Sequence, residues 1–581
     1  MPPKRKDFLK SNSQHSKHKP REPETENDFL EAADEFEQAG GKWRAGDAAK
    51  ATRFFKRAVD TYNAGLQRYQ GSFDLAYNKA NLEYQMAQDA RIASQLGSTI
   101  DLLQETLESH RFALSLDQEN ADILFNTAQV LTSLAEALTE HVKSDDPAQE
   151  SKTAARALLE EAFRKFSECL ARQEAEYAEM QQQIEATKAQ EEQAGLAADD
   201  PATSEAHDAP SAPSAEAMET SSTSSEPPEE WATVVEPITP AALLDTVIAQ
   251  LSSLTTLVSL SAPADANTIS QLSNLALPLI NTKIPHYTSL LPPPSSAPDT
   301  SPAPPPSLSL SATSPEDAPT TPKDDAILSS AAFRAALLDT SFRSNLLSAP
   351  LYSAHLAETF TPLLPAPNAP LSAGGATNAI TAYAEALIDF AATVGAKEPL
   401  ATTTTSTPPS TSPSTAAPTT PSPTRKDQWT ALSKAQTLLA RLTAPTSPLP
   451  APRLAALFLL RGDAEMHRFR LACAADAAPG WAGSAGVLVR NAGVYYRGAV
   501  AWAERAAEAG VEVELRGAAE VKAAVAECVR AVVVDGEGMG GVEPFWRARQ
   551  AEVGEVLAGM VEESLVEEGW VGGFLRALVE E

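Results

Sequence analysis

The residue types that most often carry out catalysis are present in this chain, but their spacing is not typical of an enzyme. None of the eight histidines follows an HxxxH or HExxH spacing, and the Gly-x-Ser-x-Gly sequence is absent. The run AVVVDGEGMGG, which ends at Gly541, resembles a phosphate-binding loop only superficially, because Asp535 and Glu537 would face the phosphate and no lysine follows. We therefore expect a chain that is not an enzyme and that uses no cofactor.

The three cysteines do not indicate a disulfide framework or a metal site either. Cys169, Cys473 and Cys528 lie far apart without CxxC spacing, so we expect neither a disulfide framework nor a metal site, and a reducing compartment fits this usage. No apolar run approaches the length needed to cross a bilayer, and the N-terminus lacks an apolar signal core. The expected location is the nucleus, the cytoplasm or both, without a membrane partner.

Charge and proline content indicate what the chain binds and how much of it folds. The net charge is −31, which argues against general nucleic-acid binding and favours a basic protein partner. The 44 prolines cluster in Ser/Thr/Ala-rich tracts that cannot bury enough apolar surface to offset chain entropy. Residues 1–21 are basic instead, and Lys4, Arg5 and Lys6 are a candidate nuclear-localisation signal, with an inert solvated tail as the alternative.

The segment 112–131, FALSLDQENADILFNTAQVL, predicts two antiparallel helices joined by a tight turn. Apolar residues at spacings of three and four lie on both sides of the turn-forming residues 117–120. The segment resembles the hinge of a tetratricopeptide repeat, which ends one helix with Ala-Leu-x-Leu-Asp-Pro and opens the next with an aromatic-Asn-x-small pattern. Here Gln118 stands where the family usually has proline, Thr127 where it has leucine and Ala128 where it has glycine.

The small-large-small pattern of the family's second helix recurs along the chain. It is found at Ala51, Phe55, Ala58 and Val59, at Ala162, Phe166, Cys169 and Leu170, and at Ala492, Tyr496, Ala499 and Val500. In such repeats the small residues let helix backbones approach, and several pairs must stack to bury their apolar faces. The resemblance therefore implies an all-α, TPR-like superhelix (an α-solenoid), interrupted by long disordered low-complexity loops.

Composition then divides the chain into alternating helical blocks and linkers. The expected segments are a disordered basic tail at 1–27, N-terminal repeats at 28–190, an acidic disordered linker at 191–238, a helical segment at 239–290, a Pro/Ser-rich linker at 291–325, a helical segment at 326–397, a Pro/Ser/Thr-rich linker at 398–425 and a C-terminal TPR-like block at 426–581. Within the two middle segments we expect helices at 240–262, 266–289, 326–348 and 375–395.

The resemblance implies a non-enzymatic scaffold, adaptor or assembly chaperone that binds a peptide or a basic partner protein in a groove formed by the first helices. Side chains that share a helix with an apolar opposite face are the candidate groove residues. They are Asn78, Asn81, Tyr84, Asn126 and Gln129.

A second function is also open on the same resemblance, namely a co-chaperone that binds the C-terminal tails of heat-shock proteins. Some tetratricopeptide domains grip those carboxylates with a clamp of lysines, asparagines and an arginine. Asn78 matches one clamp asparagine, but Phe36 and Gly40 stand where the first repeat would offer Lys and Asn, and Asp122 stands where the third would offer Lys. An aspartate there would repel the tail.

Overall fold

The computed structural model describes residues 23–140, 148–197, 237–261, 266–292, 320–366, 374–397, 421–508, 515–535, 549–567 and 569–570. Within these ranges the regular structure is helical and no β-strand occurs, so the expected all-α class is confirmed. The chain forms two units. Unit 1 comprises Met1–Val142 and Gln149–Lys165, and unit 2 comprises Lys143–Ala148 and Phe166–Glu581.

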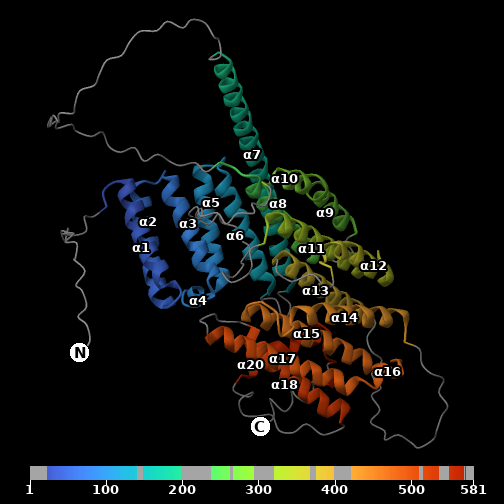
Figure 1. Cartoon of the computed structure of the whole chain (residues 1–581). Coiled ribbons are helices and arrows are strands. Elements are labelled where there is room, and N and C mark those ends of the chain that lie inside the picture. Colours follow the sequence, from blue (N-terminus) through green and yellow to red (C-terminus); the bar gives the residue numbers. More distant parts are fainter. Residues whose placement is uncertain are drawn as a thin grey trace, which may run out of the picture. The chain divides into compact units, whose positions relative to one another are not determined.

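Unit 1 is built from consecutive helices that pack against their neighbours in sequence (Figure 1). Its elements are α1 (Glu26–Arg44), α2 (Ala48–Arg68), α3 (Phe73–Gln88), the single turn α4 (Ala90–Ala93), α5 (Thr99–Leu116), α6 (Ala121–Glu140) and the first part of α7 (Ala148–Ala197). Helices α1 and α2 are antiparallel, because Tyr62 donates a hydrogen bond to Glu37 while Arg68 reaches the carbonyl of Pro23.

Short polar side chains set where these helices begin. Thr25 accepts a hydrogen bond from the backbone N–H of Asp28, whose carboxylate in turn accepts from the backbone N–H of Thr25, which completes a capping box before α1. Asp47 accepts from the N–H of Lys50 at the start of α2, at 2.9 Å. Each cap satisfies an amide that has no carbonyl partner inside its helix.

Helices α1 and α2 approach closely at a glycine. A Cβ atom placed on Gly40 would lie 2.5 Å from Cε1 of Phe55, so any larger residue would displace the ring. Phe55 is buried, together with Ala51 and Ala58 on the same face of α2. The small-large-small pattern of this helix therefore faces α1 at a distance that only a glycine permits.

We expect Gly40→Ala to destabilise unit 1 by about 1–3 kcal/mol, because the added methyl group overpacks the site against Phe55. Gly41 is the matched control, since it lies in the same helix and a Cβ atom there would meet nothing within 4 Å. Gly41→Ala should leave stability unchanged or raise it by about 0.5–1 kcal/mol through its helix propensity. Thermal unfolding of the full chain measures both, and equal effects of the two substitutions would contradict this packing.

Unit 2 contains the remaining helices. They are the rest of α7, α8 (Pro240–Ser259), α9 (Ala266–Pro278), the π-helix η1 (Leu279–Lys283), α10 (Ile284–Leu290), α11 (Pro322–Arg343), α12 (Ala349–Phe360), the 3₁₀-helix η2 (Thr361–Leu363), α13 (Gly374–Lys397), α14 (Pro423–Leu442), α15 (Ala451–Ala472), α16 (Pro479–Ala482), α17 (Ala485–Glu508), α18 (Leu515–Val529), the π-helix η3 (Arg530–Val534) and α20 (Gln550–Glu562). The most extensive packing joins α8 to α11, α13 to α14, and α17 to both α15 and α18.

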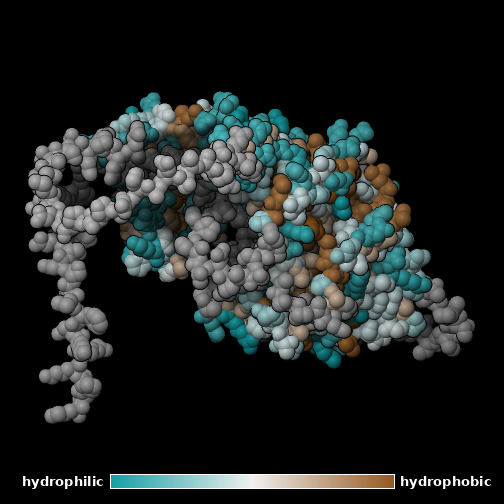
Figure 2. Space-filling model, turned by 45° about the horizontal axis from the view of Figure 1, so that its top comes forward, coloured by the Kyte–Doolittle hydropathy of each residue, from teal (hydrophilic) through white to brown (hydrophobic). Residues whose placement is uncertain are grey.

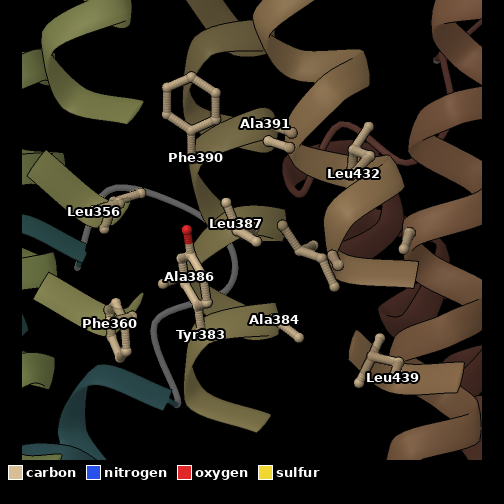
Figure 3. Packing of buried hydrophobic residues seen from close by; sticks show 14 of the residues in the cluster. Leu356, Phe360, Tyr383, Ala384, Ala386, Leu387, Phe390, Ala391, Leu432 and Leu439 are labelled. Carbon is tan, nitrogen blue, oxygen red and sulfur yellow. The ribbon is translucent and has the colours of Figure 1, made fainter. Parts of the chain in front are cut away.

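The helix α13 lies at the centre of one core of unit 2. Figure 3 shows Tyr383, Leu387 and Phe390 of α13 among side chains of α12 and α14. The rings of Phe360 and Tyr383 stack with centroids 5.1 Å apart. Leu432 of α14 closes the same cluster, and these side chains are buried. Aromatic area of this kind contributes strongly to core stability.

A buried ionic group accompanies a second glycine contact in unit 2. A Cβ atom on Gly462 of α15 would collide with the ring of Tyr496 on α17. The Tyr496 hydroxyl donates to Asp463 at 2.9 Å, and the Lys522 ammonium donates to the same carboxylate oxygen at 2.9 Å. Burial alone would lower the pKa of Lys522, but Asp463 and Glu563 outweigh it and hold the pKa above its usual value. The lysine therefore stays charged inside the unit.

The expectation that no apolar run is long enough to cross a bilayer is wrong for two helices. Pro240–Ser259 and Gly374–Lys397 both have the length and composition of a spanning helix. More than half of each apolar window is buried against other parts of the chain, as in the core helices of soluble proteins, which pass the same test.

Single apolar residues such as Leu346 and Leu351 remain exposed on the surface. Figure 2 shows brown patches among the hydrophilic residues of one face.

Helix boundaries differ from the expected segments by a few residues. The helices α1, α11 and α14 begin inside the segments expected to be linkers, and α7 continues to Ala197, past the expected end at 190. The rest of the segments 1–27, 191–238, 291–325 and 398–425 lies almost entirely outside the described residues. Helix α12 is not among the expected helices; its Pro350 lies in the first turn, where proline is well tolerated.

Candidate protein-binding site

The candidate groove residues lie on α3 and α6, which run parallel to one another. Asn126 of α6 donates a hydrogen bond from Nδ2 to Oδ1 of Asn81 on α3 at 2.9 Å, and it lies 3.3 Å from the Tyr77 hydroxyl. Further along both helices, the hydroxyls of Tyr84 and Ser133 are 2.9 Å apart. The structure thus brings these polar side chains into one ladder between the two helices.

Tyr84 also connects this ladder to α5. Its ring meets the ring of His110 edge to face, with centroids 6.1 Å apart. Burial raises the pKa of Tyr84 to about 12, so its hydroxyl stays protonated at neutral pH. His110 is fully buried, and its Nδ1 lies 2.9 Å from the carbonyl oxygen of Thr106. Because a carbonyl only accepts, Nδ1 carries the proton, while Nε2 has no hydrogen-bond partner among the described residues.

The exposure of the five candidates differs. Tyr84, Asn126 and Gln129 have exposed fractions of 7%, 4% and 8%, so most of their surface contacts neighbouring helices. Asn78 and Asn81 are half-buried and keep a surface that a partner could touch. The structure therefore gives Tyr84 and Asn126 a role in joining helices. Partner binding through this face stays a prediction that rests mainly on Asn78 and Asn81.

A pocket of about 490 Å³ lies between α2, α3 and α5 of unit 1. We call it the acidic pocket, because three of its four charged side chains are glutamates. It is lined by Val59, Asn63, Leu66, Ala76, Lys79, Glu83, Glu105, Glu108, Ser109 and Phe112. The apolar members come from all three helices, and Phe112 is exposed at the pocket.

Glu83 is the most enclosed carboxylate of the acidic pocket. It pairs with Lys79, one turn earlier on α3, at 3.5 Å, and its second oxygen is buried without a hydrogen-bond partner among the described residues. Burial raises the pKa of Glu83, and the nearby charge of Glu105 adds a smaller effect in the same direction. The charge of Lys79 and the side chains of Ser109 and Lys79 oppose both effects and lower the pKa in part. A cation that entered the pocket would therefore meet more negative charge than Lys79 neutralises.

Sequence reasoning did not identify this pocket. Its acids lie on two helices separated by the α4 turn, so nothing in the local pattern places Glu83 beside Glu105. The spacing of Glu105 and Glu108 on one face of α5 is the signal that was available, but a solvated acidic face has the same spacing. The candidate nuclear-localisation residues Lys4, Arg5 and Lys6 lie outside the described residues.

We expect the stability of unit 1 to fall on acidification because of His110. Burial lowers its pKa from 6.5 to about 4, so the neutral ring stabilises the folded state fully above pH 6.5, and this contribution is lost as the pH falls toward 4. Between pH 7 and pH 5 the loss should be about 2 kcal/mol.

The comparison of His110→Phe with the unchanged chain isolates this effect. Phenylalanine keeps a ring beside Tyr84 but does not titrate, so urea unfolding followed through the amide protection of α5 should depend less on pH. His355→Gln is the control, because His355 is exposed and interacts with Glu358 of its own helix. An unchanged pH dependence in His110→Phe would show that this histidine is not the titrating group.

Comparison with known proteins gives a partial match. No protein-family model matches the chain. A protein described as "UPF0656 protein C926.02" from Schizosaccharomyces pombe is 35% identical over 129 residues, which are 22% of this chain. The match covers 28% of that protein's length, so the chain aligns with less than a third of this relative. That description names neither an activity nor a binding partner.

Proposed function

We propose that this chain is a non-enzymatic, tetratricopeptide-like scaffold that acts as an adaptor or assembly chaperone for a basic partner protein in the nucleus, the cytoplasm or both. The proposal has two parts: a repeated helix-pair architecture that presents preformed surfaces, and a negative charge that selects the partner. Each part rests on a separate set of contacts in the described residues.

The contact that carries the first part is the glycine beneath an aromatic ring, which occurs in both units. Gly40 lies under Phe55 between α1 and α2, and Gly462 lies under Tyr496 between α15 and α17. In each case the aromatic residue sits in the small-large-small pattern of the second helix of the pair. The same packing in two distant parts of the chain supports one repeated building unit, and stacked units of this kind commonly serve as binding surfaces.

The second part rests on the acidic pocket. Its apolar lining, including Leu66 and Phe112, can hold the aliphatic stem of a lysine or arginine, while Glu105 and Glu108 can pair with the charged end. The net charge of −31 extends this preference to longer range, because it attracts basic proteins and repels acidic ones. A basic segment of the partner is therefore the proposed ligand.

We expect charge reversal in the pocket to weaken binding of a lysine- and arginine-rich peptide. The double variant Glu105→Lys with Glu108→Lys replaces two attractive charges by repulsive ones and should raise Kd by at least about tenfold, which corresponds to roughly 1.4 kcal/mol. Added salt should reduce the difference between the variant and the unchanged chain, because screening weakens both attraction and repulsion. Fluorescence anisotropy of a labelled peptide, titrated with the full chain, measures both effects.

The matched control is Glu31→Lys with Glu35→Lys, which changes the net charge equally on the exposed side of α1. A comparable loss of affinity in this control would show that net charge acts without the pocket, and would contradict the pocket as the binding site. An acidic peptide that ends in a free carboxylate should not bind, and its tight binding would favour the co-chaperone alternative instead.

Affinity purification of the full chain with mass spectrometry identifies the partner itself. We expect basic proteins to be enriched, and the variant lacking residues 1–21 should recover the same proteins if that arm serves only nuclear targeting. Recovery of only acidic or membrane proteins would contradict the proposed partner class.

A further inference from the structure

One face of α7 carries a continuous stripe at alternating spacings of four and three residues, and only its first half is covered. Phe166, Leu170 and Gln173 of this stripe are buried in unit 2. The stripe continues through Tyr177, Met180 and Ile184, of which the first two are half-buried and Ile184 is 39% exposed. We call these last three residues the open stripe. A helix end that projects into water gains stability from such an apolar row only when another surface packs against it.

The covered half lies beside α8. Thr246 of α8 donates a hydrogen bond to Oε1 of Gln173 at 2.7 Å, and Gln250 donates to the hydroxyl of Ser167 at 2.9 Å. Residue numbers rise on one helix as they fall on the other, so α7 and α8 are antiparallel. This register places Pro240, the first residue of α8, about level with Tyr177. Figure 1 shows α7 continuing past that end of α8.

The start of α8 therefore lies near the open stripe. Directly before Pro237 the sequence reads WATVVE, with Trp231, Val234 and Val235 as large apolar residues. Between Ala197 and Trp231 the only other large apolar side chain is that of Met218. The residues from Val235 to Pro240 reach up to about 16 Å, and the open stripe is about 10 Å long, so the segment can lie on it without strain.

We propose that residues 231–235 of this chain pack against the open stripe formed by Tyr177, Met180 and Ile184. The segment is joined to unit 2 at both ends, through α7 and through α8, which gives it a high effective concentration at this surface. A second copy of α7 is the less favourable occupant, because it would bring Glu176, Glu179 and Glu185 of the two helices together. Docking of the segment turns residues 198–230 into a loop closed at its base and removes the stripe from competition with partners.

Hydrogen exchange of the full chain tests this contact. The triple variant Trp231→Ser, Val234→Ser and Val235→Ser changes no residue of a described helix, so unit 2 should fold normally. We expect the amides of residues 175–190 to exchange about tenfold faster in this variant, because the last turns of α7 lose their cover. Met218→Ser is the matched control and should leave the exchange unchanged.

A cross-link decides which chain provides the cover. The pair Ile184→Cys with Val234→Cys should form a disulfide within one chain under mild oxidation, identified in the linked peptides after proteolysis. Unchanged exchange of residues 175–190 in the triple variant would overturn the proposal. A disulfide that forms only between two chains would overturn it as well, because a second copy would then cover the stripe. Neither result depends on the proposed scaffold function.

Discussion

The described helices depend on close approach between paired backbones, which glycine permits at positions such as Gly40 and Gly462. Where Gly40 faces Phe55 and Gly462 faces Tyr496, the absence of a side chain lets an aromatic ring lie close to the backbone of the neighbouring helix. The ring then fills the space that would otherwise remain between two cylinders, so area is buried without a cavity. A larger residue at either glycine would overlap the ring and overpack the interface between the two helices.

In unit 2 the close approach of α15 and α17 at Gly462 also positions the carboxylate of Asp463. The ring of Tyr496 crosses above Gly462, and its hydroxyl reaches Asp463, the next residue of α15. Lys522 completes the group from α18, so three helices share one buried carboxylate. A buried carboxylate is costly unless its oxygens accept hydrogen bonds, and here Asp463 receives two from side chains. Glycine packing and ionic pairing thus specify the same arrangement of these helices.

Polar contacts differ between two surfaces of unit 1, the α3–α6 interface and the acidic pocket. Between α3 and α6, Asn81 and Asn126 satisfy one another, which gives the interface a fixed register but leaves little of Asn126 for a partner. In the acidic pocket, Glu83 pairs with Lys79 while one of its oxygens stays without a partner among the described residues. Asn78 and Asn81 keep some accessible area on the first surface, but only the second surface carries more negative than positive charge. This contrast is why the pocket, and not the predicted groove alone, carries the proposed binding function.

The sequence by itself determined the all-α class and the positions of most helices, because apolar spacing, caps such as Thr25 and Asp47, and small residues such as Ala51 act within a few residues of chain. It did not predict α12 or the burial of Tyr84, Asn126 and Gln129. Only the tertiary structure brought Glu83 beside Glu105 and showed that the cover of α7 stops near Tyr177. Those features depend on which helices meet and in what register, and that is decided by packing between residues far apart in the sequence.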